Sequence, residues 1–178
     1  MRQLPNVVTA VRLILTPFLV LAIIREQWTA ALWLGIIAGV TDMVDGLVAR
    51  LLKLSSRVGA YFDPIADKLM LSAAYLALGV AHLLSWWIVA LVFARDVFIL
   101  AMAGYGYLFT PIREFPPSVW GKLSTLVQIC TALALVAERA GISLPSTPFV
   151  WTMVATTAWS GIHYGWLGYH KLIDASRA

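Results

Sequence analysis

The chain has 178 residues, of which 61% are hydrophobic and only 12% are charged. Soluble domains contain about 45–50% apolar and about 25% charged residues, so there is too little polar sequence here to cover a core in water. The lone cysteine, Cys130, excludes an intrachain disulfide, and the formal charge of +4 is dispersed between apolar runs, which disfavours a nucleic-acid partner. The composition predicts an integral membrane protein.

Six apolar runs have the length needed to cross a bilayer, whose hydrocarbon core takes about 20 helical residues. Lipid offers no partners to backbone N–H and C=O groups, which favours helices. We therefore expect an all-α integral membrane protein with six transmembrane helices in one bundle, forming a single domain over residues 1–178. In chain order the predicted spans are approximately Val7–Ile24, Thr29–Leu51, Asp63–Leu84, Trp86–Leu108, Val119–Val136 and Phe149–Leu172.

The basic residues indicate how these spans are oriented. With six spans, one side of the membrane carries Arg2, Arg50, Lys53, Arg57, Arg113, Lys122, Lys171 and Arg177, whereas acidic and basic residues cancel on the other side. The positive-inside rule then predicts that both termini are cytoplasmic. No small-residue cleavage site or presequence is evident, which favours a multi-pass protein of the bacterial inner (cell) membrane over a mitochondrial one.

Four aspartates interrupt the second and third spans: Asp42, Asp45, Asp63 and Asp67. Each ionised carboxylate in hydrocarbon costs at least about 2.5–3.5 kcal/mol, which makes a functional role the first hypothesis. Spacings of three and four residues place each pair on one helix face. If the two spans pack as an antiparallel hairpin, both pairs reach one depth near the cytoplasmic side. Such hard oxygen ligands suit Mg²⁺, Mn²⁺ or Ca²⁺, and two divalent cations would neutralise the cluster.

Two other interpretations of these carboxylates stay open. Asp63 before Pro64 is a good helix N-cap, with Asp67 then in the favoured acidic first turn. Asp42 and Asp45 lie deep in their span and have no such explanation. An ion-coupled or proton-coupled transporter would also use carboxylates, but it would spread them along a path and often contain an inverted repeat, and no repeat is visible here.

The aspartates belong to a longer pattern: Asp42-Met-Val-Asp45-Gly46-Leu-Val-Ala49-Arg50, eight residues, then Gly59-Ala-Tyr-Phe-Asp63-Pro-Ile-Ala-Asp67. It resembles the signature of the CDP-alcohol phosphotransferases, D-x2-D-G-x2-A-R-x8-G-x3-D-x3-D, at every fixed position. The start of the chain, from Pro5 to Arg12, is similar to the beginning of that family's first helix. The resemblance implies a six-helix membrane bundle of about this size and a homodimer.

The resemblance also implies a reaction, namely transfer of the phosphatidyl group of CDP-diacylglycerol to an acceptor hydroxyl with release of CMP. Carried over to this chain, Asp42, Asp45, Asp63 and Asp67 hold two divalent cations, Mg²⁺ or Mn²⁺, and Asp67 takes the proton from the acceptor hydroxyl. Gly46, Ala49 and Gly59 form a close-packed floor under the cytidine, and Arg50 lies at the pyrophosphate. The active site then faces the cytoplasm.

The acceptor is indicated by basic residues in the second half of the chain. Arg95, beside Asp96 in the fourth span, is either a structural ion pair or a cationic contact for an acceptor phosphate, helped by Arg113 and Lys122. Lys122 alternatively snorkels to the lipid headgroups. If the three cations converge, the acceptor is anionic and glycerol-based.

Three short segments, Ala94–Val97, Gly121–Gln128 and His163–Gly165, resemble the glycerophospholipid branch of the family. They are most similar to its cardiolipin synthases and less closely to its phosphatidylglycerophosphate synthases. We therefore expect cardiolipin synthesis with phosphatidylglycerol as acceptor, and keep phosphatidylglycerophosphate synthesis from glycerol 3-phosphate as the alternative.

Overall fold

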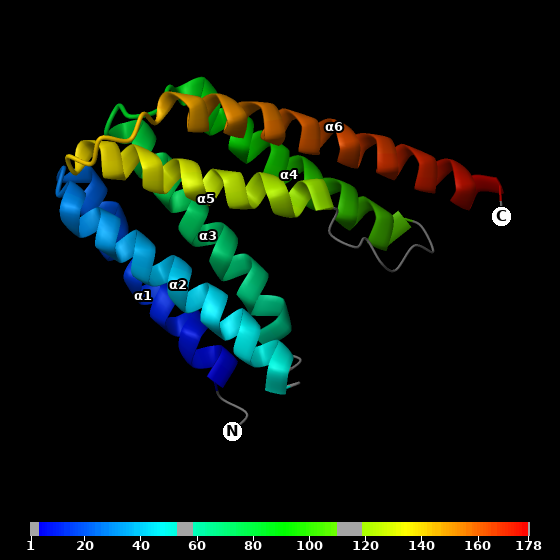
Figure 1. The fold of residues 1–178 in the computed structure, drawn as a ribbon. Coiled ribbons are helices and arrows are strands. Elements are labelled where there is room, and N and C mark those ends of the chain that lie inside the picture. Colours follow the sequence, from blue (N-terminus) through cyan, green and yellow to red (C-terminus); the bar gives the residue numbers. More distant parts are fainter. Residues whose placement is uncertain (1–3, 53–58, 110–118, 178) are drawn as a thin grey trace. The chain divides into compact units, whose positions relative to one another are not determined.

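The computed structural model describes the backbone of residues 4–52, 59–109 and 119–177, and the side chains of residues 12–41, 68–102 and 119–168. The described backbone holds six helices and no strand, so the all-α prediction is confirmed (Figure 1). The helices are α1 Leu4–Ile24, α2 Trp28–Leu52, α3 Gly59–Val80, α4 Trp86–Phe109, α5 Val119–Arg139 and α6 Thr147–Arg177.

Helices α1, α3 and α5 end in the same way, with one residue in the left-handed region: Glu26 (φ 56°), His82 (φ 55°) and Gly141 (φ 93°). The next N–H in each case bonds back to a carbonyl of the last helical turn, as in Leu83 N to Leu78 O at 2.9 Å. This closure satisfies carbonyls that a helix end would otherwise leave without partners. It explains why α3 stops at Val80 although the apolar sequence continues to Leu84.

Helix α3 begins at Gly59, four residues before Asp63. Asp63 therefore lies inside the helix rather than at its N-cap, and the helix has no acidic residue in its first turn. The interpretation of Asp63 and Pro64 as a helix start is wrong.

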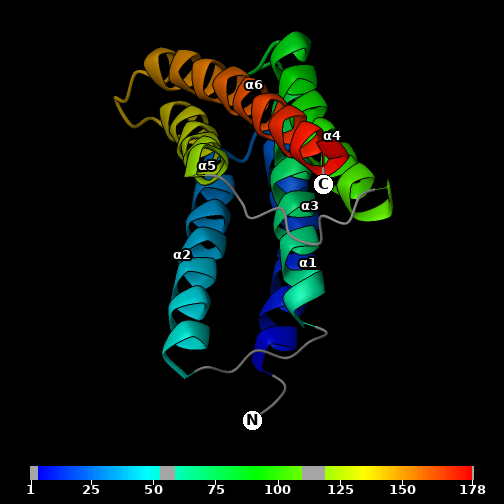
Figure 2. The ribbon, with the colours of Figure 1, turned by 90° about the vertical axis from the view of Figure 1, so that its right-hand side faces the viewer.

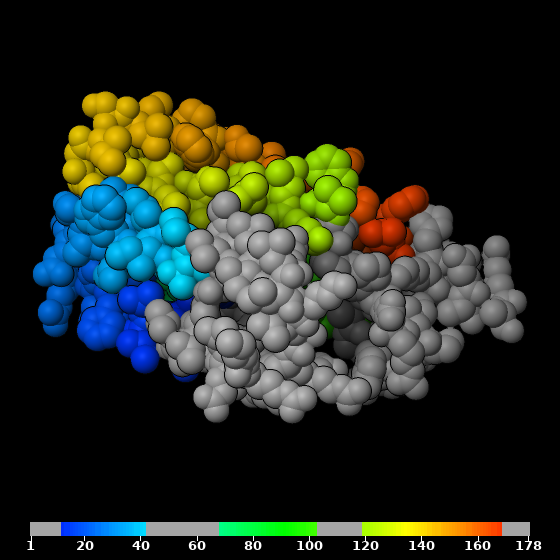
Figure 3. All heavy atoms as spheres, turned by 60° about the horizontal axis from the view of Figure 1, so that its bottom comes forward, coloured from blue at the N-terminus to red at the C-terminus, as the bar shows by residue number. Residues whose placement is uncertain are grey.

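The chain divides into two compact units, each described here by itself. The first unit comprises Met1–Leu84 and Ala132–Leu144. In it α1 packs against both α2 and α3, and its core includes Ile23, Tyr75 and Leu78 (Figures 1 and 2). The described side chains of α1 and α2 form one continuous surface, blue to cyan in Figure 3.

The second unit comprises Ser85–Thr131 and Pro145–Ala178, and in it α4 packs along α6. Glycines of α6 face α4 at this contact. A Cβ atom on Gly165 would lie 3.5 Å from Phe98 Cζ, and one on Gly168 would overlap Met102 Cε. Small residues let helix backbones approach closely where no hydrophobic force drives them together.

Large apolar side chains are exposed on every helix, among them Leu13, Trp33, Leu69, Val97 and Trp151. Within the described residues, Val119–Arg139 is long and apolar enough to cross a membrane, and Arg12–Ile24, Trp28–Thr41 and Lys68–Val80 are shorter apolar helical stretches. Exposed apolar surface of this extent is unusual in soluble monomers.

Candidate active site

The two aspartate pairs lie on two helices that share one neighbour. Asp42 and Asp45 are in α2, and Asp63 and Asp67 are in α3. The expected direct pairing of α2 with α3 is not among the close helix pairs of the described residues; α1 contacts both and so holds the two aspartate-bearing helices together. The aspartate side chains themselves lie outside the described residues, and their convergence stays a prediction.

The other residues of the pattern lie beside these pairs along the chain. Gly46, Ala49 and Arg50 are in the C-terminal part of α2, and Gly59 is the first residue of α3. Their side chains are also outside the described residues. The backbone therefore places the whole pattern in the C-terminal part of α2 and the N-terminal part of α3, both in the first unit.

The donor chemistry of the pattern fits the expected cations. Four carboxylates at helical spacing supply hard oxygen ligands, which Mg²⁺ and Mn²⁺ prefer, and the fixed positions of the pattern contain no sulfur or imidazole donor. Among the side chains that the structure describes, no group of three His, Cys, Asp or Glu could hold a metal ion. The four aspartates remain the candidate ligands.

A buried arginine lies in the same unit. The Arg12 side chain in α1 is 7% exposed, and a buried charge is costly unless an opposite charge pairs with it. The acidic residues of this unit are the four aspartates and two exposed glutamates, Glu26 and Glu138. At 1.5 Å per residue, Arg12 lies about 18 Å from the end of α1, while Asp42 lies about 21 Å from the start of α2 and Asp67 about 20 Å from the end of α3. Arg12 and one aspartate of each pair thus lie at similar distances along their own helices.

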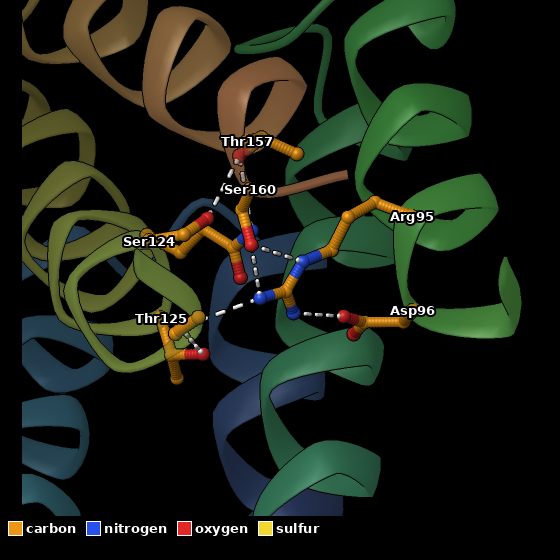
Figure 4. A network of polar contacts seen from close by, with 8 residues as sticks. Arg95, Asp96, Ser124, Thr125, Thr157 and Ser160 are labelled. Atoms are coloured by element: carbon orange, nitrogen blue, oxygen red, sulfur yellow. Dashed lines mark hydrogen bonds and ion pairs between the residues drawn. The ribbon is translucent and has the colours of Figure 1, made fainter. Parts of the chain in front are cut away.

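In the second unit, Arg95 is the centre of a buried polar network (Figure 4). Its Nη1 donates to Asp96 Oδ1 at 2.7 Å, so the ion pair anticipated from the sequence is present. Its Nε and Nη2 donate to Ser160 Oγ of α6 at 3.3 and 2.8 Å, and Nη2 also donates to the Gly121 carbonyl of α5 at 3.3 Å. Arg95 thereby joins three helices through one guanidinium group.

A polar seam between α5 and α6 continues from this network. Ser124 Oγ lies 3.4 Å from Thr157 Oγ1, Gln128 Nε2 donates to Thr157 Oγ1 at 3.1 Å, and Thr131 Oγ1 lies 3.1 Å from the Phe149 carbonyl. All four of these side chains are fully buried. Hydrogen bonds between polar side chains hold helices together where the surroundings are apolar.

The two remaining basic residues predicted to contact an acceptor are placed differently. Lys122 follows Gly121 in the first turn of α5 and is exposed. Arg113 lies outside the described residues. The network around Arg95 therefore reaches the turn that carries Lys122.

A family model described as CDP-alcohol phosphatidyltransferase matches residues 2–159. This match covers most of the chain and contains the whole aspartate pattern. The chain belongs to the CDP-alcohol phosphatidyltransferase family. It is an enzyme of that class.

Relatives of this phosphatidyltransferase carry names from two branches. A CDP-diacylglycerol–glycerol-3-phosphate 3-phosphatidyltransferase of Bacillus subtilis is 32% identical over 92% of this chain and 94% of its own length. The Escherichia coli protein of the same name is 33% identical over 91% and 92%. A Drosophila melanogaster protein named "Probable cardiolipin synthase (CMP-forming)" is 29% identical over 90% of this chain, which spans about half of that relative.

Several residues of the buried polar network around Arg95 were not anticipated from the sequence of this phosphatidyltransferase. Ser124, Gln128 and Thr131 follow one another at helical spacing in an apolar span, which predicts a single polar helix face. Ser160 carries no comparable signal, because its role depends on α4 lying against α6. The three segments that resemble the glycerophospholipid branch do meet: Arg95 bonds the Gly121 carbonyl, and Tyr164 lies against Gly121.

Proposed function

We propose that the protein transfers the phosphatidyl group of CDP-diacylglycerol to a hydroxyl of a glycerol-based acceptor and releases CMP. The acceptor oxygen attacks the lipid-side phosphorus, the bond to the bridging anhydride oxygen breaks, and CMP leaves with the bonding electrons. The observation that carries the proposal is the family match over residues 2–159, which includes every fixed position of the pattern from Asp42 to Asp67.

In this proposal Asp42, Asp45, Asp63 and Asp67 hold two divalent cations, Mg²⁺ or Mn²⁺, which supply Lewis-acid stabilisation of the negative charge that develops on departing CMP. Asp67, one helical turn beyond Asp63, accepts the proton of the attacking hydroxyl. The buried Arg12 supports a concentration of negative charge at this level of the first unit. We propose that its guanidinium offsets part of the carboxylate charge.

The donor nucleotide is assigned to the rest of the pattern. Gly46, Ala49 and Gly59 have small or no side chains and give the cytidine close access to the helix backbones. Arg50 binds a pyrophosphate oxygen through its planar guanidinium group.

Two acceptors are candidates, and each is favoured by a specific observation. The resemblance of three segments to cardiolipin synthases and the name of the Drosophila relative favour phosphatidylglycerol. The names of the Bacillus and Escherichia relatives, which this chain matches over more than nine-tenths of their lengths, favour glycerol 3-phosphate. Both acceptors are anionic, and we assign their recognition to Arg95, Arg113 and Lys122, three basic residues of the second unit.

We further propose that all six helices cross the cell (inner) membrane, with both termini and the active site on the cytoplasmic side, and that the protein is a homodimer. The distribution of lysine and arginine supports this orientation. The apolar side chains exposed on every helix support contact with lipid.

Acceptor-dependent CMP release tests the proposal. Purified protein in lipid nanodiscs receives CDP-diacylglycerol and Mg²⁺ or Mn²⁺, with phosphatidylglycerol, glycerol 3-phosphate, or inositol as the neutral control. We expect CMP and a stoichiometric lipid product with one anionic acceptor. Absence of CMP with every acceptor, together with ion-coupled uptake in proteoliposomes, would favour the transporter alternative instead.

A further inference from the structure

We propose that Arg95 is a positioning residue, which locks α4, α5 and α6 together at the first turn of α5 and so fixes the place of Lys122. This inference rests on the proposed function, in which Lys122 contacts the phosphate of the acceptor. Arg95 acts through Ser160 and Gly121 rather than by touching the acceptor.

The hydrogen-bonding capacity of Arg95 is largely used within the protein. A guanidinium group has five N–H donors. In this structure the donors go to Ser160 Oγ from Nε and Nη2, to the Gly121 carbonyl from Nη2, and to Asp96 Oδ1 from Nη1. The side chain is 6% exposed, and Asp96 balances its charge. An acceptor phosphate would have to displace one of these protein partners.

Gly121 is the residue through which Arg95 contacts α5. A Cβ atom at this position would lie 3.0 Å from both Cε2 and Oη of Tyr164 and 3.3 Å from Arg95 Nη2. The missing side chain therefore makes room for two side chains that pack onto the turn. The Gly121 carbonyl also accepts a hydrogen bond from Thr125 Oγ1 at 3.1 Å. Because successive helical residues point in different directions, the inward-facing Gly121 leaves the exposed Lys122 directed away from the network.

The geometry requires arginine rather than a general positive charge. Nε and Nη2 both donate to Ser160 Oγ of α6, while Nη1 reaches Asp96 on the same helix as Arg95 and Nη2 reaches the Gly121 carbonyl of α5. The ammonium of lysine is a single point with three donors and cannot span these acceptors in one plane. Arg95→Lys thus keeps the positive charge but loses the hydrogen bonds that join α4 to α5 and α6.

The experiment compares R95K, R95M, S160A and the double variant R95M/S160A with the wild type in nanodiscs. R139M, which removes an exposed arginine at the other end of α5, is the matched control. The readouts are KM for the active acceptor, KM for CDP-diacylglycerol and the melting temperature. We expect S160A, R95K and R95M each to raise acceptor KM by about two- to tenfold, the range that lost hydrogen bonds give, with donor KM unchanged.

The double variant identifies the route of action. If Arg95 acts through Ser160, R95M/S160A resembles R95M alone in acceptor KM, and the two substitutions lower the melting temperature non-additively. A normal acceptor KM in both R95K and S160A, with a raised KM in R95M, would show that Arg95 is a direct ionic ligand and overturn the inference. The melting-temperature cycle does not depend on turnover, so additive shifts overturn the inference even if the wild type releases no CMP and the proposed function fails.

Discussion

The contact of α4 with α6 gives a graded prediction through two glycines of one helix. A methyl group on Gly168 would overlap Met102 Cε, the end of a flexible side chain in α4. A methyl group on Gly161 would meet only Arg95 Cγ at 3.9 Å, an ordinary contact distance. Gly168→Ala therefore forces Met102 to move within a packed interface, whereas Gly161→Ala forces nothing to move.

The expected magnitudes follow from two opposing terms. Replacing glycine by alanine inside a helix stabilises it by about 0.5–1 kcal/mol. An extra methyl group in a packed interior costs about 1–3 kcal/mol, and the lower end applies here because the overlapped atom is the end of the flexible Met102 side chain. Gly161→Ala is affected only by the gain in helix stability, whereas Gly168→Ala is affected both by that gain and by the cost of the extra methyl group. The two variants should therefore differ in unfolding free energy by about 1 kcal/mol, which corresponds to a few degrees in melting temperature.

The assay is a thermal melt of each purified variant in one detergent, followed by the helical circular dichroism signal. We expect Gly161→Ala to melt at or above the wild type and Gly168→Ala to melt a few degrees below Gly161→Ala. In a Met102→Ala background, which removes the atom that is overlapped, Gly168→Ala should lose its penalty. Equal melting of the two glycine variants, or a penalty that persists without Met102, would refute the close approach of α4 to α6.

Three further outcomes follow from the first unit. Asp67→Asn should lower turnover by about 10²–10⁴-fold while Glu138→Gln, an exposed acid, leaves it unchanged; near-normal turnover in folded, metal-loaded Asp67→Asn protein rules out the base assignment. Chelation by EDTA should abolish CMP release and Mg²⁺ or Mn²⁺ should restore it, so activity that survives exhaustive chelation contradicts the metal sites. On the proposal that Arg12 offsets the charge of the aspartates, Arg12→Met should destabilise the protein by about 3–5 kcal/mol, whereas Arg25→Met at the exposed end of α1 should not. Matching melting temperatures in the two variants would contradict that pairing.

Helix positions could be predicted from the sequence because lipid-spanning length and apolar composition act on each segment alone. The start of α3 could not, because Asp63 and Pro64 carry a strong local signal for a helix start, yet the helix continues back to Gly59. The left-handed conformation of Glu26 and His82 could not be predicted either, since neither is the glycine that such a helix end favours.

The candidate site could likewise be predicted from the sequence only in part. The aspartate pattern could be found from the sequence because its chemistry is unusual in apolar helices and its spacing is local. Arg95 could be singled out for the same reason, because a charged side chain is unusual in an apolar helix. Its hydrogen-bond partners could not be predicted, since Gly121 and Ser160 lie on two other helices. Sequence spacing says nothing about contacts of that kind, and so the acceptor end of the site could be proposed only in outline.

The central claim is that four carboxylates of α2 and α3 bind a pair of divalent cations. Titration of the purified protein with Mn²⁺, followed by electron paramagnetic resonance of free and bound ion, measures this without requiring turnover. The account predicts two bound Mn²⁺ per chain in the wild type, with spin coupling between them, and loss of that coupling in each of Asp42→Asn, Asp45→Asn, Asp63→Asn and Asp67→Asn. Binding that is absent in the wild type, or unchanged in all four variants, would contradict it.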